Sequence, residues 1–65
     1  MKHFIILNYY NSRKSVSVPI EDIRSIRECD DYTEVHYGED SISRVKNSVQ
    51  EIVKRINEVI NNSNK

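Results

Sequence analysis

The clearest pattern along the chain is a stripe of aliphatic residues near its C-terminal end. These residues recur at intervals of three, one, three, three and one positions, which places them on one side of an α-helix. The stripe comprises Val49, Ile52, Val53, Ile56, Val59 and Ile60. Ser48 and Glu51 form a capping box, in which each side chain accepts a hydrogen bond from the other residue's backbone N–H. No apolar residue follows Ile60, so we expect the helix to end by about residue 62 and residues 63–65 to form a disordered polar tail.

The chain before this helix contains five short segments with the character of β-strands. The expected strands cover residues 4–7, 15–20, 23–28, 32–37 and 41–46. The first is a continuous apolar run, which predicts a central strand buried on both faces, whereas the second and fourth alternate apolar and polar residues. Pro19 cannot donate a ladder hydrogen bond and should end its strand or lie on an edge, and Gly38 marks a tight turn. The uneven spacing of Ile42 and Val45 suggests a bulge in the last strand or an early end to its pairing.

The order of these elements predicts an α+β fold in one domain, residues 1–62. We expect a small antiparallel five-stranded sheet or open barrel (β-β-β-β-β-α), capped by one C-terminal amphipathic helix. A core of this size rarely supplies more than about 3–5 kcal/mol of stability. Cys29 is the only cysteine, which excludes an internal disulfide. Self-association would be a natural supplement, so we expect a homodimer or a protein-bound state about as readily as a monomer.

The charges of the chain balance overall but are unevenly distributed. Ten basic and ten acidic residues give a net charge of zero, so the chain has no general attraction to nucleic acid or anionic lipid. Residues 21–40 are strongly acidic, and the segments on either side are basic. Asp30, Asp31 and Glu34 within this acidic segment are a candidate docking surface for a partner protein.

The residues expected for catalysis or metal binding are sparse. The two histidines, His3 and His36, have no neighbours at the short spacings of a zinc or copper site. The thiolate of Cys29 would be disfavoured by the aspartates that follow it. A single glycine excludes glycine-rich phosphate loops. We therefore predict a protein that is not an enzyme and holds no metal or cofactor, and whose partner is another protein of unknown identity.

One loop gives an alternative in nucleic-acid binding. Tyr9, Tyr10, Arg13 and Lys14 lie close together between the first two expected strands. An aromatic ring with basic neighbours is the smallest arrangement that can stack a base and hold its phosphate. The tyrosines could equally cover an edge of the core, and two cations alone would bind weakly at physiological salt.

The first apolar run is four residues long, which is too short for a signal-peptide core or a membrane span. We therefore expect a cytoplasmic protein that does not insert into membranes.

The chain from Leu7 to Ile60 resembles the FlbD-like family of small proteins encoded among bacterial flagellar genes. The matching segments are Leu7-Asn8, Ile20–Ile23 with Ile26, Val45–Val49, and Glu51–Val53 with Ile56. This resemblance implies a non-catalytic motility accessory that acts through protein contacts. Residues 19–56 also resemble the opening half of a LytTR DNA-binding domain, which implies a regulatory role. A third hypothesis is a phage or mobile-element protein that inhibits a host factor through the acidic segment.

Overall fold

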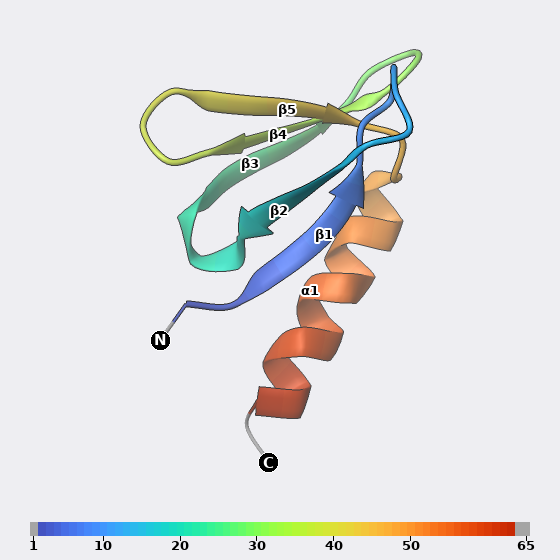
Figure 1. Ribbon diagram of the computed structural model, residues 1–65. Coiled ribbons are helices and arrows are strands. Elements are labelled where there is room, and N and C mark those ends of the chain that lie inside the picture. Colours follow the sequence, from blue (N-terminus) through green and yellow to red (C-terminus); the bar gives the residue numbers. More distant parts are fainter. Residues whose placement is uncertain (1, 64–65) are drawn as a thin grey trace.

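The computed structural model describes residues 2–63 and shows five antiparallel strands in two sheets, followed by one helix (Figure 1). The strands are β1 (Phe4–Asn8), β2 (Ser15–Pro19), β3 (Ile23–Glu28), β4 (Thr33–Tyr37) and β5 (Ser41–Val45). A short 3-10 turn, η1 (Ile20–Asp22), follows β2, and the helix α1 (Val49–Ser63) ends the described chain. The predicted α+β fold is confirmed, but its strands form neither one continuous sheet nor a closed barrel.

The two sheets meet at one corner and diverge from it. The hairpin β1-β2 is one sheet, and the meander β3-β4-β5 is the other. At the corner, Tyr9 forms a single β-bridge with Val45, and the Asn8 carbonyl accepts a hydrogen bond from Lys46 N–H at 2.8 Å. Beyond this point α1 packs against β1 and β3 (Figure 1). The helix therefore covers a side of the core that the two sheets leave open.

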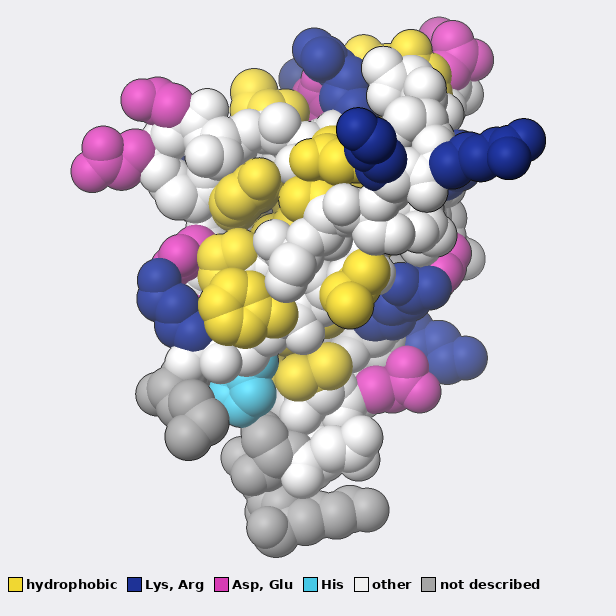
Figure 2. Space-filling view, viewed as in Figure 1, with side chains coloured by type: hydrophobic (Ala, Val, Ile, Leu, Met, Phe, Trp, Pro, Cys, Tyr) yellow, Lys and Arg dark blue, Asp and Glu magenta, His cyan; other side chains and the backbone are white. Residues whose placement is uncertain are grey.

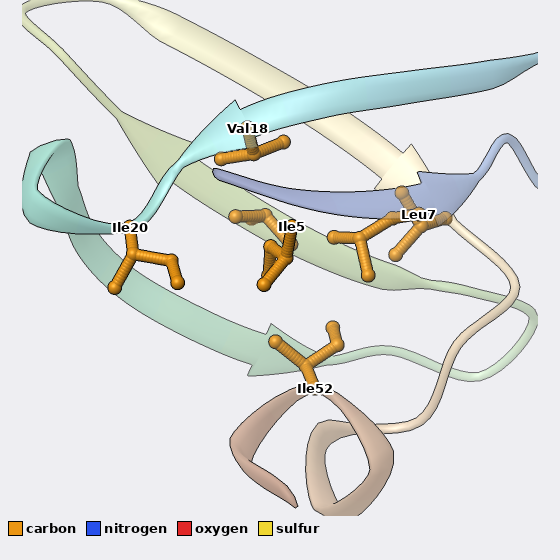
Figure 3. Packing of buried hydrophobic residues seen from close by; sticks show 7 residues of the cluster. Ile5, Leu7, Val18, Ile20 and Ile52 are labelled. Atoms are coloured by element: carbon orange, nitrogen blue, oxygen red, sulfur yellow. The ribbon is translucent and has the colours of Figure 1, made fainter. Parts of the chain in front are cut away.

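Both sheets and the helix contribute to one small core. The buried apolar residues in the described chain are Ile5, Leu7, Val18, Ile20, Val35, Val45 and Ile52. Figure 3 shows the side chains of Ile5 and Leu7 from β1 and Ile52 from α1 pointing toward one another. The predicted apolar stripe of the helix is wider than this contact, because Ile52 is fully buried while Val53 and Ile60 remain exposed. Ile52, in the first turn, is thus the fully buried side chain of the helix, while Ile56 and Val59 pack against the core in part.

The first strand does not have the environment that its sequence predicts. Ile5 and Leu7 face the core, but Phe4 is 53% exposed and Ile6 is 62% exposed. The prediction of a central strand buried on both faces is therefore wrong. The reason is that β1 pairs along its length with β2 alone, and the sheet that they form has only one covered face.

In β3 and β5 the apolar residues are three positions apart, which does not fit strict alternation, and the two strands accommodate this spacing in different ways. In β3 the pairing with β4 shifts between Ile23 and Ser25, and this irregularity lets both Ile23 and Ile26 pack against the core. In β5 the register with β4 is regular from end to end. Ile42 and Val45 simply lie on opposite faces, so Ile42 is exposed and Val45 is buried. The bulge predicted for this last strand is not present, whereas β3 contains an irregularity.

The predicted turn residues lie where the chain needs them. Pro19 is the last residue of β2 and lies opposite Phe4. Hydrogen bonds between His3 and Ile20 and between Tyr9 and Lys14 fix the alternation of the ladder, so the nitrogen of Pro19 points away from β1. Gly38 has a φ of 64°, in the left-handed region that glycine tolerates best. The tight turn between β4 and β5 depends on this conformation.

The start of α1 is attached to β1 through side-chain hydrogen bonds. Ser48 Oγ accepts the Glu51 N–H at 3.1 Å, as the capping box predicts. The Glu51 carboxylate instead accepts hydrogen bonds from Asn47 Nδ2 at 3.0 Å and from Arg55 Nη2 at 2.8 Å. Asn47 Oδ1 accepts the Asn8 N–H at 2.9 Å, and Arg55 Nη1 donates to the Ile6 carbonyl at 2.5 Å. These contacts replace half of the predicted capping box and dock the helix along one strand.

The far end of the helix lies slightly beyond the predicted boundary. Helical backbone continues to Ser63, which the sequence placed in a polar tail that should begin after about residue 62. The other two residues of that predicted tail, Asn64 and Lys65, lie outside the described residues.

The hydrogen-bonded contact between Glu21 and His3, next to β1, makes one pH-dependent contribution to stability. Glu21 accepts hydrogen bonds from the His3 ring at 2.5 Å and from the His3 backbone N–H at 2.8 Å. These two hydrogen bonds lower the pKa of Glu21 from 4.5 to about 2. A carboxyl whose pKa is lower in the folded state stabilises the fold above its unfolded pKa. The contribution is therefore fully present above pH 4.5 and is lost as the pH falls toward 2.

We expect the melting temperature of the wild-type protein to exceed that of the Glu21→Gln variant at neutral pH. The difference should shrink as the pH falls from 4.5 toward 2, because the Glu21 carboxyl then becomes progressively protonated and loses the charge that glutamine lacks. Circular-dichroism melts across this range would measure it. A difference that stays constant with pH would show that the Glu21 charge does not matter.

Candidate functional site

The surface with the most varied exposed chemistry is the side of β3-β4-β5 that faces away from the core. The strand registers place two rows of side chains across this surface. Val35 and Val45 point into the core, so the residues that alternate with them point outward. We call this surface the outer sheet face; it comprises Ser25, Arg27, Glu34, His36, Ile42 and Arg44.

A cluster of aromatic rings and an arginine lies at one end of the outer sheet face. The ring centroids of Tyr10 and Tyr32 are 4.9 Å apart, and the rings are tilted by 41°. The guanidinium carbon of Arg44 lies 5.5 Å from the centre of the Tyr32 ring. A hollow of about 420 Å³ is bounded by these three side chains and by Ile42. The hollow can receive a planar or apolar group, with a cation at its side.

The corner between the two sheets holds this cluster in place. The Tyr10 N–H donates to the Arg44 carbonyl at 3.1 Å, which fixes the loop after β1 against β5. Tyr32 directly precedes β4, and the Cys29 N–H donates to its carbonyl at 2.8 Å. The sequence singled out Tyr10 but neither Tyr32 nor Arg44, because the contact between them depends on two distant segments meeting.

The four residues of the predicted nucleic-acid loop have different environments. Tyr9 is half-buried, forms a backbone bridge with Val45 and lines the hollow next to Tyr10. Tyr10 is 38% exposed and belongs to the aromatic cluster. Arg13 and Lys14 are exposed in the loop that follows. Both tyrosines thus border the hollow, and the ring of Tyr10 is the one that contacts Tyr32.

The three residues of the predicted acidic surface do not lie together. Asp30 and Asp31 are exposed in the turn that precedes Tyr32, near the loop that carries Tyr10. Glu34 lies in the middle of the outer sheet face, where its side chain is only 16% exposed. Its carboxylate lies 3.3 Å from His36 Nε2 and 3.7 Å from Arg44 Nε. Glu34 therefore positions neighbouring side chains, and only the two aspartates are open to a partner.

The opposite end of the outer sheet face has a second hollow and a second pair of acids. This hollow has a volume of about 460 Å³ and lies beside Arg24, His36 and Ile42. Arg24 Nη1 donates to the Glu39 carbonyl at 3.0 Å, which holds the arginine against the turn. The turn also exposes the side chains of Glu39 and Asp40. Each end of the outer sheet face thus combines an arginine, Arg44 or Arg24, with a pair of exposed acidic side chains.

The described residues contain neither a candidate cluster of metal ligands nor a helix that could span a membrane. Within residues 2–63, no group of three or more histidine, cysteine or acidic side chains is placed to hold a metal ion. The helix in this part of the chain is too short and too polar to span a membrane.

Comparison with known proteins gives no match for the chain. No protein-family model, curated protein or solved structure matches it. The functional argument therefore depends on the fold and on the outer sheet face, and the resemblance to the FlbD-like and LytTR families stays a prediction from the sequence.

Proposed function

We propose that the protein is a non-catalytic module that binds another protein through the outer sheet face. The observation that supports this function is the exposed cluster of Tyr10, Tyr32 and Arg44 beside Ile42, which is 51% exposed. Tyrosine and arginine are enriched in the central contacts of protein interfaces, where they combine apolar area with a polar tip. The helix packs against β1 and β3, so it leaves this part of the sheet accessible.

The distribution of charge favours a protein partner over a nucleic acid. A polyanion lying along the arginines would meet Asp30 and Asp31 at one end and Glu39 and Asp40 at the other. Each pair would repel phosphate, and the whole chain has no net positive charge to offset this. A protein surface can place acidic groups opposite the arginines and basic groups opposite the two ends.

Single-stranded nucleic acid is the second candidate, because one specific feature favours it. The tilted Tyr10 and Tyr32 rings with Arg44 beside them resemble the stacking platforms of proteins that bind single strands. Arg13 and Lys14 are exposed in the same loop as Tyr10 and could contact the backbone of the strand. Binding of this kind would depend strongly on salt.

The sequence resemblance supports a motility accessory as the biological setting of this module. An inhibitor of a host factor is the alternative, and its partner would then contact the acidic residues at the ends of the outer sheet face. Location in the cytoplasm remains a prediction from the sequence.

The proposal is tested by changing the two most exposed apolar side chains of the site. We expect Tyr10→Ala combined with Ile42→Ser to lose the partner, because both residues line the same hollow and neither supports the core. Val53→Ser on α1 is the matched control, since Val53 is also apolar and exposed but lies away from the site. Proteins captured on each variant would be identified by mass spectrometry, and the affinity of the purified partner would be measured by calorimetry. We expect an affinity loss of at least about tenfold for the double variant and none for the control.

Two outcomes would contradict the proposal. A partner that binds the double variant as tightly as the wild type does not use the outer sheet face. The second outcome is binding of a fluorescent oligo-dT at micromolar protein that weakens with salt and disappears in the Tyr10→Ala variant. This result would favour nucleic acid over a protein as the ligand of the outer sheet face.

A further inference from the structure

The outer side of the β1-β2 hairpin is a second exposed surface, distinct from the outer sheet face. Ile6 and Phe4 are the two most exposed large hydrophobic residues of the described chain. In the ladder Phe4 lies opposite Pro19, and Ile6 lies opposite Ser17. Figure 2 looks onto the side of the molecule that carries this hairpin, and it shows hydrophobic side chains gathered in the middle with basic and acidic side chains around them. We call the surface the hairpin face; it comprises Phe4, Ile6, Ser15, Ser17 and Pro19.

Folding does not explain why these two residues are apolar. The core contacts of the hairpin are made by Ile5, Leu7 and Val18, which point to the other side of the sheet. On the hairpin face β2 already carries serines, so this side of the sheet tolerates polar residues. Two adjacent, half-exposed hydrophobic side chains on one strand are therefore better explained by a contact than by the stability of the monomer.

The charges around the hairpin face are paired with one another. Lys2 Nζ lies 2.9 Å from Asp22, and the His3 ring contacts Glu21. On the helix side, Arg55 lies 2.8 Å from Glu51 and also donates to the Ile6 carbonyl. Each border thus combines both signs, and a highly charged partner or an anionic membrane would find no net opposite charge there. A rotated copy of the same face offers a matching border.

We infer that the hairpin face is the contact between two copies of this chain. In a two-fold dimer each patch meets its own counterpart, so Phe4 and Ile6 of one protomer pack on the same residues of its partner. The border of Lys2 and Asp22 then faces the partner's border of mixed charge, and the zero net charge of the chain removes general repulsion between the copies.

The size of the chain is compatible with such a contact. A stable interface takes about 800 Å² from each partner, which is roughly a sixth of the chain's accessible surface of 4857 Å². The molecule measures 36 × 23 × 20 Å, so one broad face can supply this area. The outer sheet face belongs to the other sheet and stays free, so a dimer would present two copies of it. The inference does not depend on what the outer sheet face binds.

Sedimentation equilibrium of the wild-type chain tests the inference first. We expect a monomer–dimer equilibrium between micromolar and millimolar concentrations. Phe4→Ser combined with Ile6→Ser should weaken self-association at least about tenfold, whereas Val53→Ser should leave it unchanged. Wild-type chain that stays monomeric at millimolar concentration would overturn the inference.

A measurement on the wild-type chain locates the dimer contact without a substitution, so it does not depend on whether a variant folds. In methyl NMR spectra recorded during dilution, the Ile6 signals should shift, while those of Ile42 on the outer sheet face should not. The opposite pattern would assign the dimer to the other face and overturn the inference.

Two further experiments separate the hairpin face from rival contacts. Ser17 turns its backbone N–H away from β1, so Ser17→Pro removes a donor on the free edge of β2 and also replaces the side chain opposite Ile6. Ser17→Ala is the control, because it changes the side chain and keeps the donor. A dimer that survives Ser17→Pro supports packing of the faces, and one that is lost with Ser17→Pro but kept with Ser17→Ala points instead to edge pairing. Sedimentation with phosphatidylcholine–phosphatidylglycerol vesicles should show no binding. Vesicle binding that Phe4→Ser abolishes would assign the surface to lipid.

Discussion

Replacing Ile52 with alanine should unfold most of the protein at room temperature. Ile52 is fully buried and is the residue through which α1 enters the core, beside Ile5 and Leu7 (Figure 3). Truncating a buried isoleucine to alanine costs about 2–5 kcal/mol, because it removes apolar contacts and leaves a cavity. A core of this size supplies only about 3–5 kcal/mol in total. The loss is therefore comparable to the whole free energy of unfolding.

Urea titration followed by circular dichroism would measure this effect. The control is Val53→Ala, which changes the next residue of the helix at a position that is 44% exposed. We expect the control to change the free energy of unfolding by no more than about 0.5 kcal/mol. If Ile52→Ala melts like the wild type, α1 does not pack as described, and the fold itself would have to be revised.

Replacing Asn47 with alanine should destabilise the protein by about 2 kcal/mol, although no apolar contact is lost. The side chain of Asn47 is buried between β5 and α1 and connects two segments. Its oxygen accepts the Asn8 N–H, and its nitrogen donates to the Glu51 carboxylate. Alanine would leave the Asn8 amide without its acceptor and would release the first turn of the helix from β1.

The matched control for this change is Asn62→Ala, an exposed asparagine near the far end of the same helix. In thermal melts, the melting temperature of the control should be close to that of the wild type, and that of Asn47→Ala should be well below it. Asn47→Asp should be intermediate, because it keeps the acceptor for Asn8 but loses the donor to Glu51 and adds a like charge. Equal melting temperatures for Asn47→Ala and Asn62→Ala would show that the connection is not needed.

The elements of the fold were predictable because each depends on neighbouring residues. The helix follows from the spacing of its aliphatic residues, and the turn at Gly38 follows from the one glycine of the chain. The division into two sheets was not predictable in this way. A run such as Phe4–Leu7 is compatible with a strand buried on both faces and with a strand that exposes a patch. Which of the two environments forms depends on the strands that pair, and the residues next to this run do not indicate that pairing.

The candidate site was predictable only in part, for a related reason. Tyr10 was identified from its basic neighbours, but its partners Tyr32 and Arg44 come from other strands. The pairing of Glu34 with Arg44 could have been found by counting back from the Gly38 turn, since the two residues lie opposite each other in β4 and β5. The corner where Tyr10 meets β5 has no comparable signal in the sequence.

The polar contacts of α1 along β1 determine where the smaller sheet can grow. Arg55 occupies the Ile6 carbonyl and Asn47 occupies the Asn8 N–H, so these side chains fill positions that a neighbouring strand would otherwise use. An incoming β-strand, whether from a peptide or from an aggregating chain, would have to join this sheet at β2. There Pro19 contributes no donor and β2 is only five residues long, so even this open edge of the hairpin offers a short and incomplete template for an added strand.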